Sequence, residues 1–102
     1  MNIQHQFSGG TLQIGLFGEL DESHAEYVRD SLDAMFRDRS ISEVIIDLSG
    51  LSFMDSTGIG VLIGRYKTLK SRGIALKLSR PSRPVDKVLA LTGIYNIMPK
   101  IN

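Results

Sequence analysis

Residues 51–60 read LSFMDSTGIG and join an apolar segment of strand length, residues 43–49, to a segment of helical periodicity, residues 59–69. Asp55 or Ser56 can cap the new helix, because a side-chain oxygen there accepts a hydrogen bond from an N–H group two or three residues further on. A phosphate on a hydroxyl at this helix end would meet free N–H groups and the favourable end of the helix dipole. The stretch therefore predicts a strand, a turn and a helix, with a candidate phosphate-accepting serine at the turn.

Strand and helix patterns alternate along the rest of the chain. The near-continuous apolar run at 44–46 indicates a central strand. We expect an α/β fold with a mixed, mostly parallel sheet in sequential strand order after an N-terminal hairpin, and helices packed mainly on one face. The expected strands span 3–7, 11–17, 43–48 and 74–78, with a last short one within 94–101; the expected helices span 23–38, 57–71 and a short segment between Ser82 and Gly93.

The first helix has two candidate N-caps. Ser23 with Glu26 fits a capping box, and Asp21 is the alternative cap. Parallel strands place Asp21, Ser56 and the loop at 79–84 along the same edge of the sheet, at the carboxyl ends of the strands. Open α/β sheets usually present their sites at this edge.

Length and composition exclude several classes of protein. The 102 residues predict one domain, residues 1–102, large enough to bury a core without disulfides or a structural metal. The absence of cysteine excludes thiol catalysis, disulfides and a cysteine-based metal site. No apolar run approaches the length of a membrane helix, so we expect a cytoplasmic protein with no membrane partner.

The small net charge of +1 conceals an uneven distribution. Residues 1–64 contain ten acidic and three basic residues, whereas residues 65–102 contain one acidic and nine basic residues. One interpretation is that the two halves lie side by side and present solvated faces. The other is a basic rim for nucleic acid or an acidic partner. The chain has no Trp and only two aromatic residues in its basic half, which argues against nucleic acid.

Residues 51–67, LSFMDSTGIGVLIGRYK, resemble the signature of STAS-domain anti-sigma factor antagonists. GELD at 18–21 and LTGI at 91–94 match the other two landmarks of this family in order and spacing. The likeness covers nearly the whole chain and is strongest to the group that antagonises anti-sigma-F factors in spore-forming bacteria. It implies a single STAS domain and a binding module in transcription regulation, not an enzyme.

The resemblance also implies a partner-switching cycle. The unphosphorylated protein would bind an anti-sigma factor that is also an ATP-dependent serine kinase, and so free a sigma factor. The kinase would then phosphorylate Ser56, the first serine after the aspartate of the motif, and a separate serine phosphatase would reset it. Whether the system serves sporulation or stress is left open. The alternative is a STAS-type module that senses a small ligand or nucleotide.

The same resemblance implies a partner surface around this serine. Ser56 as a catalytic nucleophile is disfavoured, because no G-x-S-x-G elbow surrounds it. Carboxylates at Glu19, Asp21 and Asp55 could hold Mg²⁺, but their spacing matches no dedicated ion cage, so we expect no metal and no cofactor.

The presence of glycine within the predicted helix has two possible explanations, close packing on the sheet or a bare surface that a partner can approach. The two explanations are equally good for Gly58 and Gly60, whereas packing is favoured for Gly64. The expected partner-binding residues are Glu19, Asp21, Asp55, Ser56, Thr57, Gly58, Ile59 and Gly60.

Overall fold

The computed structural model describes residues 1–102 and contains one four-stranded sheet in the order β1–β2–β3–β4. The first two strands form an antiparallel hairpin, and β3 and β4 continue the sheet parallel to β2. The predicted mixed, mostly parallel sheet in sequential order is confirmed. The strands are β1 (Asn2–Ser8), β2 (Thr11–Leu20), β3 (Glu43–Met54) and β4 (Ala75–Ser79).

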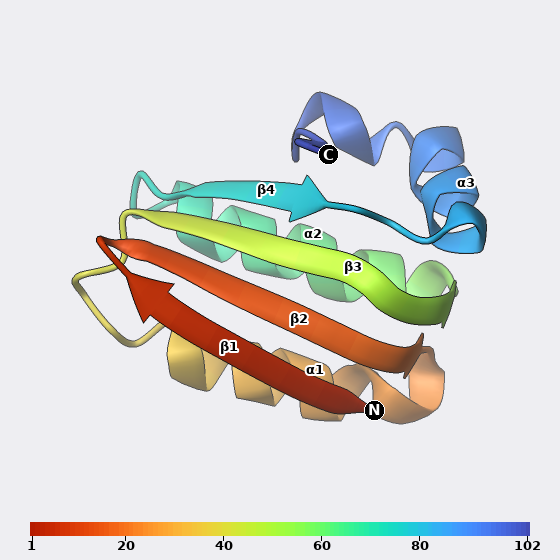
Figure 1. The fold of residues 1–102 in the computed structure, drawn as a ribbon, viewed down its shortest axis with the longest axis horizontal. Helices are drawn as coiled ribbons and strands as arrows, with labels where there is room; N and C mark the ends of the chain where they lie inside the picture. Colours follow the sequence, from red (N-terminus) through yellow and green to blue (C-terminus); the bar gives the residue numbers. More distant parts are fainter.

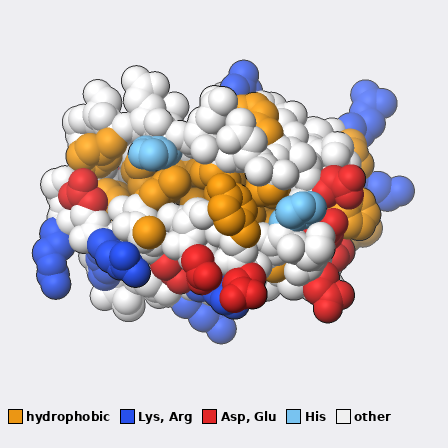
Figure 2. Space-filling view, turned by 90° about the horizontal axis from the view of Figure 1, so that it is seen from below, with side chains coloured by type: hydrophobic (Ala, Val, Ile, Leu, Met, Phe, Trp, Pro, Cys, Tyr) orange, Lys and Arg blue, Asp and Glu red, His pale blue; other side chains and the backbone are white.

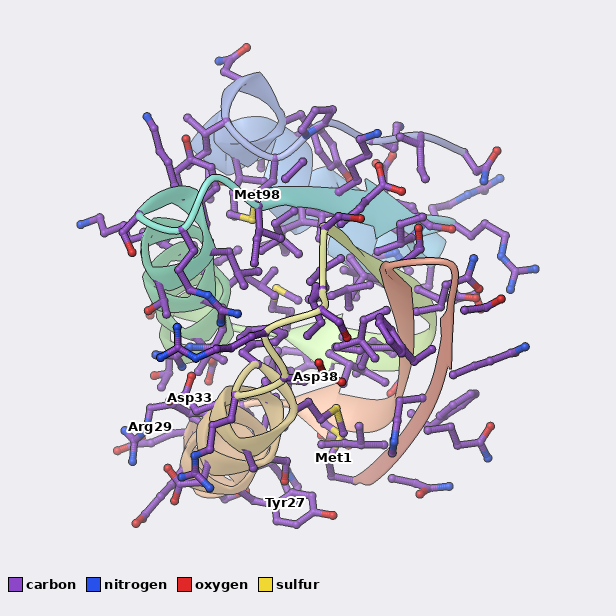
Figure 3. All side chains as sticks on the ribbon, turned by 90° about the vertical axis from the view of Figure 1, so that its left-hand side faces the viewer. Met1, Tyr27, Arg29, Asp33, Asp38 and Met98 are labelled. Atoms are coloured by element: carbon purple, nitrogen blue, oxygen red, sulfur yellow. The ribbon has the colours of Figure 1, made fainter.

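Helices α1 (Glu22–Met35) and α2 (Ser56–Lys70) lie side by side on one face of the sheet, as Figures 1 and 3 show. Helix α3 (Arg83–Thr92) lies near the carboxyl ends of β3 and β4 and packs against β3 (Figure 1). A short 3₁₀ turn (Ile94–Asn96) follows α3. The expectation that the helices cover mainly one face is therefore confirmed. None of the helices is both long and apolar enough to span a membrane.

A single apolar cluster between the sheet and the helices forms the core. Alternate residues of β3 enter it, and so do Val28 and Leu32 of α1 and its C-cap residue Phe36. Helix α3 buries a narrow face. Val85 and Leu89 are buried, but Leu91 of the same helix is 80% exposed.

Two strands extend further than the sequence predicts. β3 continues past residue 48 to Met54, and β2 continues past residue 17 to Leu20, so residues 51–54 of the stretch 51–60 belong to a strand. Ser49 and Gly50 are residue types typical of a strand end, but β3 continues through them. The missing side chain of Gly50 instead lets β2 approach closely. A Cβ at Gly50 would lie 2.7 Å from the Leu16 carbonyl oxygen and would also meet the ring of Phe17.

The prediction of a last strand within 94–101 is wrong. Ile94 begins the 3₁₀ turn, and only an isolated bridge between Leu78 and Lys100 extends the sheet. Ile94 and Met98 are both buried, a four-residue spacing that fits a helical turn better than a strand. Gly93 ends α3 as predicted, with φ of 75° in the left-handed region.

The acidic and basic halves of the chain face each other. Three ion pairs join them across sequence separations of more than thirty residues, which supports the side-by-side interpretation. The Lys77 ammonium, 2.6 Å from Glu43, holds the pKa of that carboxyl below its ordinary value. The pairs are Arg65–Asp33, Lys77–Glu43 and Arg80–Asp47.

Candidate functional site

Asp55 is the single residue between the end of β3 and the start of α2. Its backbone is extended, with φ −109° and ψ −173°, and its Oδ1 accepts a hydrogen bond of 3.0 Å from the N–H of Gly58. This is the geometry of a helix N-cap. Of the two candidate caps, Asp55 is therefore the one that the structure uses.

The second carboxylate oxygen of Asp55 reaches the other helix. Asp55 Oδ2 accepts a hydrogen bond of 3.2 Å from the N–H of Glu22, the first residue of α1. One side chain thus accepts hydrogen bonds from N–H groups in the first turns of two helices, although Glu22 and Asp55 are 33 positions apart in the sequence. This contact fixes the start of α2 against the start of α1.

Asp21 caps α1 at the same edge of the sheet. Its Oδ1 accepts hydrogen bonds from the Ser23 hydroxyl at 2.8 Å and from the His24 N–H at 3.2 Å, and lies 2.8 Å from His24 Nδ1. The hydrogen bond from the Ser23 hydroxyl is the main cause that holds the pKa of Asp21 below its ordinary value, and the His24 ring and N–H lower this pKa further. The predicted box of Ser23 with Glu26 is not formed, because Ser23 donates to Asp21.

Ser56 is the first residue of α2, and both it and Thr57 are exposed. The Ser56 hydroxyl makes no hydrogen bond within the protein, because Asp55 has taken the capping position. The N–H groups of Ser56 and Thr57 belong to the first turn and have no acceptor within the helix. The site therefore presents a free, exposed hydroxyl beside unpaired N–H groups.

The three glycines of α2 differ in their surroundings. A Cβ at Gly58 would lie 2.5 Å from the carbonyl oxygen of Leu20 and 2.8 Å from Met54 Cγ, so close packing requires this glycine. A Cβ at Gly60 or Gly64 would meet nothing within 4 Å. Gly60 is thus a bare surface position, and the packing explanation for Gly64 is wrong.

The remaining predicted residues divide between surface and interior. Glu19 is exposed near the end of β2, whereas Ile59 is 8% exposed and belongs to the core. Phe53 pairs in register with Glu19, is 46% exposed and was not among the predicted site residues. The sequence carries no signal for its exposure, because that exposure depends on the register of β3.

A shallow depression of about 510 Å³ lies between the two helix starts. Its lining consists entirely of polar residues, among them Asp21 and Asp55. No group of three His, Asp or Glu side chains in the chain is close enough together to hold a metal ion. The edge therefore presents acidic and hydroxyl groups to the solvent. The four lining residues are Asp21, Glu22, Ser23 and Asp55.

The whole chain is similar to known proteins. The family model of the STAS domain matches residues 2–102, and the chain belongs to this family. It is 33% identical over 99 residues to the anti-sigma F factor antagonist of Paenibacillus polymyxa. The aligned region covers 97% of this chain and 85% of that protein. It is 30% identical over 98 residues to the anti-sigma-B factor antagonist of Bacillus subtilis (strain 168), covering 96% of this chain and 88% of that protein.

Two solved structures of the anti-sigma factor antagonist SpoIIAA share the fold. The unphosphorylated form is 32% identical and superposes with a TM-score of 0.81, covering 99% of this chain and 89% of that one. The phosphorylated form of the Bacillus SpoIIAA is 29% identical with a TM-score of 0.74, covering 99% and 92%. A protein similar to this one thus exists in both states.

Replacing Asp55 tests its double role. We expect Asp55→Ala to lower the free energy of unfolding by about 1–2 kcal/mol, because two helices lose an N-terminal acceptor. Asp55→Asn keeps one acceptor oxygen and should lose less. Asp30→Ala is the control, since Asp30 is exposed and pairs only with its neighbour Arg29. Urea unfolding measures all three, and equal stability of Asp55→Ala and Asp30→Ala would contradict the double cap.

Two glycines of the same helix form a matched pair. Gly58→Ala should destabilise the protein by about 1–3 kcal/mol, because the new methyl group overlaps the backbone of β2. Gly60→Ala should stabilise it by about 1 kcal/mol, because alanine favours the helix and its methyl group meets open space. Thermal melts compare the two variants. A shift in the same direction for both would show that steric contact does not distinguish these positions.

Proposed function

We propose that this protein is an anti-sigma factor antagonist switched by phosphorylation of Ser56. In the unphosphorylated state it binds an anti-sigma factor that is also an ATP-dependent serine kinase, and a sigma factor is released. The kinase transfers phosphate to Ser56 and the complex dissociates; a serine phosphatase restores the binding form. The observation that carries the proposal is the free, exposed hydroxyl of Ser56 at the start of α2.

A phosphate on Ser56 has opposing local effects on stability. It adds a charge of about −1.5 to −2 at neutral pH. The first-turn N–H groups and the helix dipole favour this charge by roughly 0.3–1 kcal/mol per unit charge. Repulsion from the carboxylate of Asp55, the preceding residue, opposes it by a similar amount. The fold should therefore tolerate the modification with little net change in stability.

The same phosphate has a large effect on docking. A typical protein interface covers about 800 Å² on each partner, so a partner centred on Ser56 would cover the whole start of α2. Docking would then remove water from a near-dianion, which costs several kcal/mol unless the partner supplies matching cations. Each 1.4 kcal/mol changes affinity about tenfold, so a loss of about a thousandfold or more follows.

The proposed docking surface consists of the exposed groups around Ser56. Thr57 and Gly60 adjoin it on α2, and Gly60 offers a bare patch where the partner can approach the helix backbone. Glu19 and the caps Asp21 and Asp55 contribute negative charge that suits a basic partner surface. Gly58 and Ile59 act from the interior, by fixing the helix against the sheet.

The geometry gives little support to an enzymatic role. Ser56 has no hydrogen-bonded base, and the nearby imidazole of His24 is engaged by Asp21. The proposed binding role requires no cofactor or metal, and neither nucleic acid nor a membrane is among the proposed partners. As a regulator of transcription it would act in the cytoplasm. A pull-down from the native cell, with mass spectrometry of the partner, would distinguish a sporulation sigma factor from a stress sigma factor.

Phosphorylation assays distinguish the two neighbouring hydroxyls. With ATP and the anti-sigma kinase, wild-type protein and Thr57→Ala should take up phosphate, whereas Ser56→Ala should take up none and still bind the kinase. Mass spectrometry of the tryptic peptide locates the phosphate. Modification mainly at Thr57 would overturn the assignment. Failure of every candidate kinase to modify or bind the protein would instead favour a small-ligand or nucleotide sensor.

A charge reversal tests the docking surface. Glu19 makes no hydrogen bond or ion pair in the protein, so Glu19→Lys should leave the melting temperature nearly unchanged. Its affinity for the anti-sigma factor should fall by about tenfold or more, because an interfacial charge changes sign. Asp30→Lys, on the exposed surface of α1 about two turns from its start, is the control. Equal affinities of the two variants would place the interface elsewhere.

A further inference from the structure

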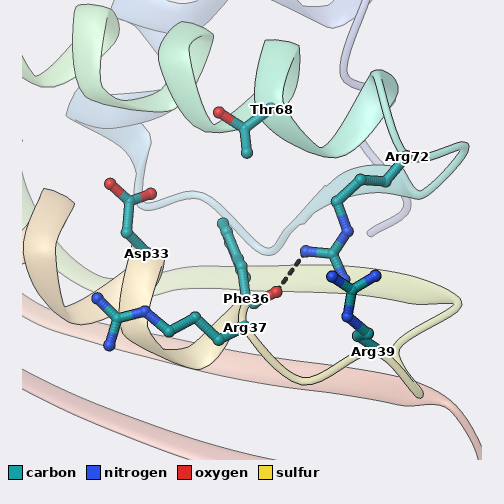
Figure 4. Close-up of a pocket in the computed structure, with 6 residues that line it drawn as sticks. All are labelled: Asp33, Phe36, Arg37, Arg39, Thr68 and Arg72. Carbon is teal, nitrogen blue, oxygen red and sulfur yellow. Dashed lines mark hydrogen bonds between the residues drawn. The ribbon is translucent and has the colours of Figure 1, made fainter.

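A second charged site lies at the other end of the two helices. Here the C-termini of α1 and α2 form the walls of a groove of about 600 Å³, lined by Asp33, Phe36, Arg37, Arg39, Thr68 and Arg72. Figure 4 shows the groove, and Figure 3 looks onto this end of the molecule. Thr68 and Ser56 are twelve residues apart on α2, or about 18 Å along its axis, so the groove is separate from the Ser56 surface.

Arg72 is fixed in the groove by backbone acceptors. Its Nη1 donates to the carbonyl of Phe36, the C-cap of α1, and its Nη2 donates to the carbonyl of Asp38 at 3.1 Å. These contacts place a guanidinium over carbonyl groups at the negative end of the α1 dipole. They hold Arg72 in one orientation, with no carboxylate within ion-pair distance of it.

Two further guanidinium groups have no partner at all. Arg37 and Arg39 follow α1 directly and are exposed, and their side chains make no hydrogen bond or ion pair in the protein. In Figure 4 the side chain of Arg39 extends to the same end of the groove as that of Arg72. Like charges brought to one place repel each other unless an anion lies between them. Figure 2 shows a group of Lys and Arg side chains at this end of the molecule.

The nearby carboxylates are already engaged. Asp38 accepts hydrogen bonds from the hydroxyl and N–H of Ser40, which together with the charge of Arg72 hold its pKa below the ordinary value. Asp33 Oδ1 lies 2.9 Å from Nε of Arg65, close enough for an ion pair although the N–H is not aligned for a hydrogen bond. The groove therefore keeps an excess of positive charge.

We propose that this groove binds a small, densely charged oxyanion with two or more linked phosphate groups. Guanidinium groups match phosphate oxygens with paired, charge-assisted hydrogen bonds. Phe36 is the only apolar residue in the lining and is 2% exposed, so the groove offers no exposed apolar residue to a peptide or a nucleobase. The phosphates of free pyrophosphate and those of a nucleotide tail present the same chemistry to Arg39 and Arg72, whose guanidinium groups lie together, and Arg37 extends to the other end of the groove (Figure 4).

Titration with pyrophosphate at low ionic strength, followed by amide NMR, tests the proposal. We expect saturable shifts at residues 33–39 and 68–72 and an affinity reduced about tenfold or more in Arg37→Gln/Arg39→Gln. Neither guanidinium makes a hydrogen bond or ion pair in the fold, so the double variant should melt like the wild type. A nucleoside triphosphate should bind no more tightly than inorganic triphosphate, since only its phosphates are recognised.

Arg83→Gln supplies the matched control, because Arg83 is exposed and equally unpaired but lies on α3, away from the groove. Its affinity for pyrophosphate should stay within about twofold of the wild type. Shifts centred on Ser56, equal losses in Arg83→Gln and the double variant, or no saturable binding would each overturn the proposal. Tighter binding of the nucleoside triphosphate than of inorganic triphosphate would show that a base is recognised, contrary to the lining of the groove.

Discussion

The carboxylate of Asp55 is the contact on which the site depends. Its two oxygens accept the N–H groups of Gly58 and Glu22, and so join the starts of α2 and α1 at the edge of the sheet. Because Asp55 supplies the cap, Ser56 is left with a free hydroxyl on the first turn. A serine in the capping position would have bound its own helix. The motif thus divides two tasks between adjacent residues, since the aspartate builds the helix start and the serine faces the solvent.

Packing beneath the site explains why the switch can be local. Gly58 lets α2 approach the end of β2 to a distance that excludes any side chain, and Ile59 anchors the same turn in the core. The start of α2 is therefore held from below by β2 and from the side by Asp55. A charge added to the outward-facing hydroxyl changes the electrostatics of the surface, while the contacts that hold the helix lie on its other side. An interface covering this turn would respond strongly even though the fold does not.

Hydrophobic periodicity was sufficient to predict the order of the elements as far as α3, the sheet topology and the side of the sheet that the helices cover, but it wrongly added a strand after α3. It was not sufficient to predict the lengths of β2 and β3. A glycine at position 50 is typical of a strand end, but in the structure β3 continues through Gly50 and the ring of Phe17 on β2 lies against it. The motif located Ser56, but the choice between Asp55 and Ser56 as cap depends on coordinates. The bond from Asp55 to Glu22 joins distant segments, and no local pattern encodes it. The exposure of Phe53 depends likewise on the register of β3, which the sequence leaves open.

The most direct test compares phosphorylated and unmodified protein in one titration with the anti-sigma factor, followed by amide NMR. Before the partner is added, the two spectra should differ only around Ser56 and the adjoining start of α1, since the phosphate acts through local charge. On addition of the partner, the unmodified protein should bind, and the phosphoprotein should bind about a thousandfold more weakly or not at all. Spectral differences throughout the sheet, or a phosphoprotein that still binds tightly, would contradict a local electrostatic switch at Ser56.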